Sequence, residues 1–260
     1  MKKSFTVLIF MLIVVMSCGC EVLPDASTSS SVTLSRTRAQ IENYIISSIY
    51  EASSLDMSAK VRIHEGEETT EITFYYVCNQ KNETNDFEMA MSMFLKVIHD
   101  EQDTTLHLSQ AYLKDYVLYM SLLNPSDGDY DLYQVAFSPS EELVSLAGLN
   151  LFYSAPLDEL FNTITQNLLT EGTFVSTSTY TINLSSVENN AGIKSIIVNP
   201  LLDQLTIYAE EYESNTKIEQ EIIMIPGFGV QRISIPYPDE FIGYEDITLA
   251  QLQTLIGASA

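Results

Sequence analysis

Six runs of strand-forming residues follow one another in the first half of the chain, and short polar turns separate them. The runs span residues 58–66, 69–80, 85–100, 104–113, 115–123 and 130–137. Each is rich in aromatic, β-branched, leucine or methionine residues, which favour extended strands. Turns this short join strands that lie side by side and run in opposite directions. The spacing therefore predicts an antiparallel meander.

Helical patterns lie before, between and after the strand runs. Thr37 and Gln40 have the spacing of a capping box, which predicts that a helix begins there. Apolar residues at helical spacing predict two further helices, at 138–148 and 157–171. A last short helix is predicted from residue 248. The central helices thus separate two groups of strands.

The second group of strand runs completes the predicted fold. These runs span residues 173–186, 201–213, 216–225 and 230–235. About ten antiparallel strands are too many for a flat sheet, so the sheet should curl or close. The helices must bury their apolar faces on that sheet. We therefore expect an α+β fold: a strongly curved antiparallel sheet, or half-barrel, of about ten strands with helices on its concave face.

The first residues have the layout of a secretory signal, with two lysines, an uncharged apolar run at 5–16, and small residues that end in cysteine. Positions 15–18, Val-Met-Ser-Cys, resemble the lipobox of bacterial lipoproteins, in which the cysteine receives a diacylglycerol. Cys18 is the expected lipid attachment residue because an aliphatic residue stands three positions before it, and Cys20 is the alternative. An ordinary signal peptide or an uncleaved anchor are the other interpretations. Two acyl chains would hold the protein stably on a membrane.

These features divide the chain into a lipoprotein signal peptide (1–17), a flexible Ser/Thr-rich tether (18–36) and a single α+β half-barrel domain (37–260). Without residues 1–17 the chain loses two lysines and no acids, so its formal charge changes from −23 to about −25. Such a charge repels polyanions, so no nucleic-acid partner is expected. The expected location is the extracytoplasmic face of the cell membrane, through the N-terminal lipid.

The order of these elements is similar to that of lipoprotein carriers of the LolA/LolB type and of the mycobacterial LppX/LprG lipoproteins. The similarity covers residues 37–241 in element order, from the meander through the central helix pair to the segment "ISIPYPDEF". Those families are built as an unclosed β-barrel with helices over its mouth and an apolar cavity that holds acyl chains. The resemblance implies this architecture, but those families have no short motif from which functional residues could be carried over.

Apolar residues alternate along the third strand run, so that three methionines share one face with Phe87. Methionine is unbranched and polarizable, and it therefore fills irregular space and adapts to ligands of varied shape. The candidate wall of a hydrophobic-ligand cavity comprises Phe87, Met89, Met91, Met93, Met120, Phe161 and Leu168. The alternative is that the same residues pack together as an ordinary core.

Signatures of metal sites and of enzymes are missing from the sequence. It has no G-x-S-x-G elbow, no H-E-x-x-H helix and no phosphate-binding loop. The acidic residues in 127–131 fail the spacing of a calcium loop, so we expect a hairpin turn there. Cys78 lies in an apolar run, and His64, His99 and His107 have no partners nearby in sequence. We therefore expect no catalytic residue, no metal and no cofactor.

Two function classes fit these observations. The first is a non-enzymatic, membrane-anchored lipoprotein that binds a lipid or another hydrophobic ligand. The second is a surface interaction or structural lipoprotein with a filled core, whose strand-face tyrosines bind an envelope protein. These tyrosines are Tyr75, Tyr119, Tyr133, Tyr208 and Tyr212. An enzyme would need paired carboxylates, or a histidine and a carboxylate, within hydrogen-bond reach in a cleft.

Overall fold

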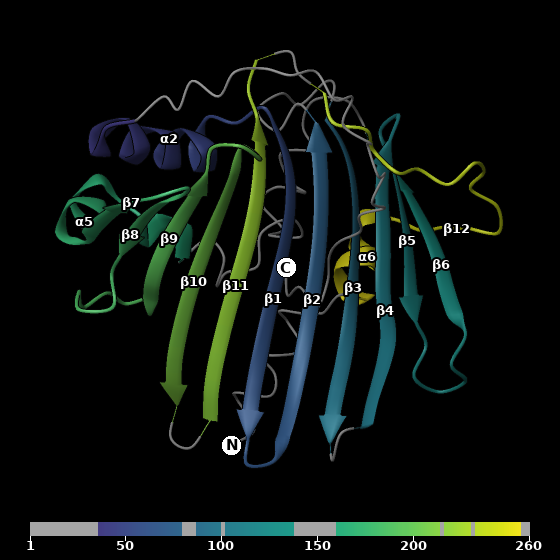
Figure 1. Ribbon diagram of the computed structural model, residues 1–260. Coiled ribbons are helices and arrows are strands. Elements are labelled where there is room, and N and C mark those ends of the chain that lie inside the picture. Colours follow the sequence, from purple (N-terminus) through teal and green to yellow (C-terminus); the bar gives the residue numbers. More distant parts are fainter. Residues whose placement is uncertain are drawn as a thin grey trace, which may run out of the picture.

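One large open sheet dominates the structure, a computed structural model that describes residues 36–79, 87–99, 102–137, 160–213, 216–229 and 232–255 (Figure 1). Its strands are β1 (Ser54–Glu65), β2 (Glu68–Asn79), β3 (Glu88–His99), β4 (Gln102–Lys114), β5 (Val117–Leu123), β6 (Tyr130–Ala136), β7 (Thr173–Ser176), β8 (Tyr180–Asn183), β9 (Ile193–Asn199), β10 (Gln204–Glu213), β11 (Thr216–Gly227) and β12 (Glu245–Asp246). The named helices of the described residues are α2 (Arg38–Tyr50), α5 (Gln166–Glu171) and α6 (Leu249–Leu255).

The sheet consists of two meanders joined in the middle. Its strand order is β12-β6-β5-β4-β3-β2-β1-β11-β10-β9-β8-β7. The central pair is β1 with β11, antiparallel from Ser54 opposite Gly227 to His64 opposite Lys217. Only β12 pairs in parallel, with β6, among the described strands. The first meander is the one predicted from the sequence, and the long-range β1–β11 ladder makes both meanders one sheet.

The second meander differs from its prediction in three places. The run at 173–186 forms a hairpin of two short strands, β7 and β8, and β9 was not predicted. In the run at 230–235, residues 232–235 form no strand. The side-chain amide of Asn79 donates to the Ile233 carbonyl and accepts from the Ile233 N–H, both at 2.8 Å. The backbone groups that a ladder would need at this position are therefore already used.

The predicted helices agree with the structure at the two ends of the chain and differ in the middle. Thr37 and Gln40 form the expected capping box of α2, and Thr248 exchanges hydrogen bonds with the Gln251 side chain and backbone before α6. The helix predicted at 157–171 is interrupted: Thr165 is extended, and its hydroxyl accepts from the Leu168 N–H as the N-cap of α5. The helix predicted at 138–148 lies outside the described residues.

The apolar core lies on one face of the sheet. Alternate residues of β1, such as Met57, Ala59 and Val61, are buried in a single cluster with strands on both sides. Helix α2 adds Ile41 and Ile45, α5 adds two leucines, and α6 adds one to the same cluster. The helices that the structure describes therefore share one hydrophobic core with the sheet.

Arg38 makes an ion pair within α2 and a hydrogen bond to α5. Glu42 of α2 is 4 % exposed, and its carboxylate lies 2.6 Å from Arg38 Nε one turn away. The same guanidinium donates to the carbonyl of Leu169 in α5. Arg38 thus neutralises a buried carboxylate and ties α2 to α5.

The segment 232–246, here called the strap, covers part of the opposite face of the sheet. The ring of Phe241 stacks on Tyr119 with 3.8 Å between centroids, and the Tyr237 hydroxyl donates to the Leu113 carbonyl. Tyr244 packs edge-on against Tyr119. The strap then pairs with β6 as β12, and α6 follows and buries Leu252 in the core cluster. The C-terminal chain therefore passes from one face of the sheet to the other around the β6 edge (Figure 1).

We expect the stacked pair Tyr119 and Phe241 to hold the strap on the sheet. In a double-mutant cycle, Tyr119→Ala and Phe241→Ala should couple by about 1 kcal/mol in the free energy of unfolding, since each removes the same ring contact. Urea unfolding of the wild type, both single variants and the double variant measures this coupling. Tyr75→Ala is the control, because Tyr75 packs on Phe94 instead, and its effect should add to that of Phe241→Ala. Additive effects of Tyr119→Ala and Phe241→Ala would contradict this role of the strap.

Candidate functional site

A row of methionines crosses the core face at right angles to the strands. The row follows successive register partners on β10, β11, β1, β2, β3, β4, β5 and β6, which are Leu205, Met224, Met57, Tyr76, Met91, Ala111, Met120 and Tyr133. Four of these eight positions are methionine. Flexible, polarizable methionine side chains from four strands therefore lie along one line, with Tyr76 and Ala111 between some of them.

The predicted cavity residues come together on this face. Met89, Met91 and Met93 of β3 are at most 2 % exposed, and Met120 lies in the same cluster. The other members, Phe161 and Leu168, are buried in the cluster, and Phe87 packs against it half-buried. The structure thus joins all seven predicted residues in one apolar region. Burial as complete as that of the three β3 methionines favours a filled core, because side chains that line an open cavity would keep some exposed surface.

Ser109 of β4 breaks the apolar pattern of this face. Its register partners are Met93 on one side and Leu122 on the other. Among the side chains that the structure describes, only the Ser109 hydroxyl is buried without a hydrogen-bond partner. Leaving a buried hydroxyl unpaired costs about 1–3 kcal/mol. The sequence analysis missed this residue because only the strand register shows which neighbours surround it.

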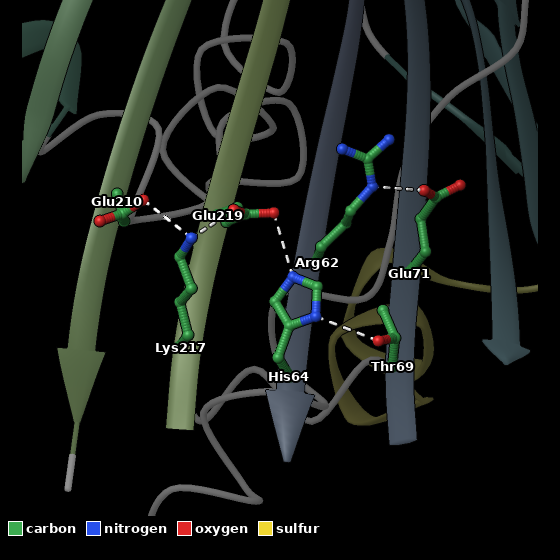
Figure 2. A network of polar contacts seen from close by, with 7 residues as sticks. All are labelled: Arg62, His64, Thr69, Glu71, Glu210, Lys217 and Glu219. Atoms are coloured by element: carbon green, nitrogen blue, oxygen red, sulfur yellow. Dashed lines mark hydrogen bonds and ion pairs between the residues drawn. The ribbon is translucent and has the colours of Figure 1, made fainter. Parts of the chain in front are cut away.

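A network of charged residues occupies the opposite face, on β1, β2, β10 and β11 (Figure 2). Lys217 Nζ lies 2.6 Å from the Glu219 carboxylate and 3.0 Å from that of Glu210. The His64 ring lies between Glu219 and Thr69, with Nε2 and Nδ1 each 3.0 Å from an oxygen. This network brings residues 64–69 next to residues 210–219 through the β1–β11 pairing.

A second ion pair lies beside this network on the same face. Arg62 Nε donates to the Glu71 carboxylate at 2.8 Å, and Lys60 Nζ lies 3.6 Å from its other oxygen. Opposite charges therefore alternate between neighbouring strands on this part of the face. Such cross-strand pairs stabilise the register of the sheet.

Lys217 controls the protonation of its two carboxylate partners. Its hydrogen bond is the main cause that lowers the pKa of Glu219 below the ordinary value, and His64 adds to this effect. The hydrogen bond from Lys217 likewise lowers the pKa of Glu210. In return, the hydrogen bonds to Glu219 and Glu210 raise the pKa of the Lys217 ammonium. The three groups are therefore held in their charged forms.

The pair His64 and Glu219 satisfies the distance criterion for acid–base chemistry, with the Thr69 hydroxyl on the other ring nitrogen. Both side chains of the pair are about one-third exposed, at 33 % and 35 %. Water screens the charges of side chains that are this exposed. Electrostatic stabilisation of a transition state is strong only in a site that excludes water. The Glu219 carboxylate is also already ion-paired with Lys217. The arrangement therefore fits a structural ion network better than a catalytic centre.

The other polar residues of interest are also placed by the structure. His107 stacks on Phe94, its Nε2 lies 3.1 Å from the Ser92 hydroxyl, and burial lowers its pKa. Cys78 is fully buried in the core. In the turn after β5, the Asp127 carboxylate accepts from the Asp129 N–H, which confirms a hairpin turn.

Within the described ranges, no three His, Cys, Asp or Glu side chains are placed to share a metal ion. The side chain of His99 is not among those described.

The five tyrosines of the interaction hypothesis do not form one exposed surface. Tyr119 stacks against the strap, and Tyr75 packs on Phe94. Tyr133 lies on the core face with its register partner Met120, whereas the other four tyrosines lie on the opposite face. Tyr208 and Tyr212 are exposed on β10, at 37 % and 68 %. A contiguous tyrosine patch is therefore not available as the surface for an envelope partner.

The predicted anchor residues, Cys18 and Cys20, lie outside the described residues, as do the signal peptide and residues 18–35 of the tether. In the described part of the chain, no helix combines the length and the apolar character that a membrane crossing requires. No model of a known protein family matches the sequence, and no curated protein is significantly similar to it. Functional arguments therefore depend on the chain's own residues.

Replacing Lys217 with methionine should raise the pKa of Glu219 and of Glu210, because both lose their main hydrogen-bond donor. In the native protein these pKa values lie below the ordinary 4.5, so the stabilisation is present above that pH and is lost as pH falls through the folded-state values. The variant should therefore be less stable than the wild type at neutral pH, with a difference that shrinks in acid.

Carboxyl NMR titration and urea unfolding across pH measure both effects of the Lys217 substitution. Lys60→Met is the matched control, because it removes a lysine from the same face but from beside Glu71. It should leave the Glu219 titration unchanged. An unchanged Glu219 pKa in Lys217→Met would show that this network does not control the carboxylate.

Proposed function

We propose that this protein is a non-enzymatic, membrane-anchored lipoprotein of the extracytoplasmic face that binds a lipid or a similar hydrophobic ligand on the core face of its sheet. In this proposal the open sheet curves as a half-barrel, its concave side carries the apolar residues, and the helices lie on that side. The ligand lies between the methionine row and the helices.

The unpartnered hydroxyl of Ser109 is the observation that carries this proposal. A core that is complete by itself gains nothing from a serine between Met93 and Leu122, because the hydroxyl loses its hydrogen bonds to water on burial. A lipid molecule carries a polar group, such as an ester carbonyl or a hydroxyl, attached to apolar acyl chains. Ser109 can bind that atom while the neighbouring side chains contact the acyl chains.

The methionine row supports the same ligand class. Acyl chains are flexible and vary in length, and unbranched methionine side chains can change rotamer to follow them at little cost. Met57 faces Met224, and Met91 and Met120 are separated only by the small Ala111. Two adaptable pairs therefore lie near the centre of the sheet, one on each side of Tyr76, where a rigid leucine or valine core would select one shape.

The alternative function is a surface interaction or structural lipoprotein with a filled core and no small-molecule ligand. The near-complete burial of Met89, Met91 and Met93 favours this alternative, since these side chains have almost no surface left to expose. The two functions differ in whether a molecule leaves the purified protein on extraction. Both retain the lipid anchor at Cys18 or Cys20.

Native mass spectrometry of the mature protein purified from membranes, followed by organic extraction, tests the proposal. We expect a co-purifying hydrophobic molecule with at least one acyl chain. Ser109→Ala should retain less of that molecule, because its polar contact is lost. The bare variant should be at least as stable as the bare wild type in urea unfolding, because an unpaired buried hydroxyl has been removed.

Ser92→Ala is the matched control for this experiment. Ser92 is also a buried serine of the central strands, but it lies on the opposite face, and its hydroxyl is paired with His107. This variant should retain the ligand at the wild-type level. Bare protein in every preparation would contradict ligand binding and favour the filled-core alternative.

A further inference from the structure

An exposed apolar rim lies at the end of the sheet where β10 begins and β11 ends, below α2 (Figure 1). Two consecutive leucines, Leu201 and Leu202, occupy the β9–β10 turn with 87 % and 59 % of their surface exposed. Phe228, directly after β11, is 41 % exposed. Hairpin turns normally carry polar residues, which leave no apolar surface in water. Adjacent exposed leucines at a turn therefore indicate a surface that is covered by something else.

Tyr44 of α2 connects the parts of this rim. Its hydroxyl donates to the carbonyl of Asp203 at 2.9 Å, which ties α2 to the leucine turn. Its ring centroid lies 6.4 Å from that of Phe228. The Arg36 guanidinium lies over the Tyr44 ring, 5.5 Å from the ring centroid. The rim, defined as Tyr44, Leu201, Leu202 and Phe228, is thus held together by α2 and has a cation beside it.

Arg36 shows where the chain that precedes it reaches the sheet, which is beside the rim. Arg36 is the first described residue, and its N–H donates to the Tyr180 hydroxyl of β8. Seventeen residues separate it from Cys18, a contour length of at most about 65 Å. A tether anchored at Cys18 would therefore join the domain at this end of the sheet.

We propose that the rim docks on the lipid surface to which the protein is anchored, with Leu201, Leu202 and Phe228 inserted among the lipids. Leucine and phenylalanine partition into the acyl region, while tyrosine and arginine suit the headgroup level. Arg36 would lie near lipid phosphates, which it can bind. This inference rests on the proposed membrane anchoring and is independent of the proposed ligand.

The charge of the protein selects the kind of lipid surface. The chain carries a formal charge of −23, which opposes close approach to anionic lipids. Zwitterionic headgroups do not repel the protein in this way, so the insertion of the apolar rim residues can determine the orientation of the protein on the bilayer. Docking in this orientation would bring the end of the sheet that carries α2 next to the bilayer, where a lipid could enter or leave the core face.

A single tryptophan can test the docking, because the sequence contains none. The full chain, purified from membranes, is reconstituted into phosphatidylcholine vesicles with and without brominated acyl chains, which quench tryptophan on contact. Leu201→Trp is the reporter at the rim. Tyr212→Trp is the matched control, since Tyr212 is an exposed aromatic residue near the far end of β10. We expect a blue shift and loss of emission from Leu201→Trp, with neither change in Tyr212→Trp.

Each other outcome of this experiment has a defined meaning. Equal quenching of the two reporters, or no quenching of Leu201→Trp, would overturn the docking. A blue shift of Leu201→Trp that is already present without vesicles, together with a larger oligomer, would assign the rim to a second protein copy and would also overturn it. Quenching of Leu201→Trp in a preparation without a bound ligand supports docking while the ligand proposal fails. Quenching in protein whose mass shows no acyl chains supports docking while the anchor proposal fails.

Discussion

The antiparallel ladder between β1 and β11 is the interaction on which the rest of the structure depends. It joins residues 54–64 to residues 217–227 and so closes a loop of most of the domain. Each meander alone would expose an unpaired strand at this position, and such an edge pairs readily with other chains. The ladder removes both edges, aligns Met57 with Met224, and brings His64 beside Lys217. Both the methionine row and the charged network exist because of this one register.

The two faces of the sheet are stabilised in different ways. The core face buries alternate apolar residues against α2, α5 and α6, and this burial supplies most of the favourable free energy. The opposite face has the strap over Tyr112 and Tyr119, and ion pairs around Lys217 where it is open. Exposed ion pairs contribute little to stability, but opposite charges on neighbouring strands disfavour a shifted register. The strap thus covers apolar rings, whereas the network maintains alignment.

The proposed membrane anchoring and the proposed ligand binding make complementary demands on this architecture. The proposed lipid-binding face must be apolar and adaptable; the methionine row has both properties, and Ser109 is a polar position two residues along β4 from its member Ala111. A tethered domain also needs a defined orientation if lipid is to pass between the membrane and that face. The rim beside Arg36 offers such an orientation, because its exposed leucines lie at the end of the sheet where the proposed tether would join the domain. The two proposals use different residues and can fail separately.

Local patterns in the sequence determined the first meander, the capped helices at the two ends and the apolar character of Met89, Met91 and Met93, because alternation and capping depend on neighbours along the chain. They could not predict β9 or the break at Thr165, where distant packing competes with propensity. They suggested a methionine stripe along one strand, whereas the register made a row across several strands. The strap, the isolation of Ser109 and the contact of His64 with Glu219 were decided by the tertiary structure alone. Each of these depends on residues that only long-range strand pairing and side-chain packing bring together, and such pairing leaves no signal in local sequence.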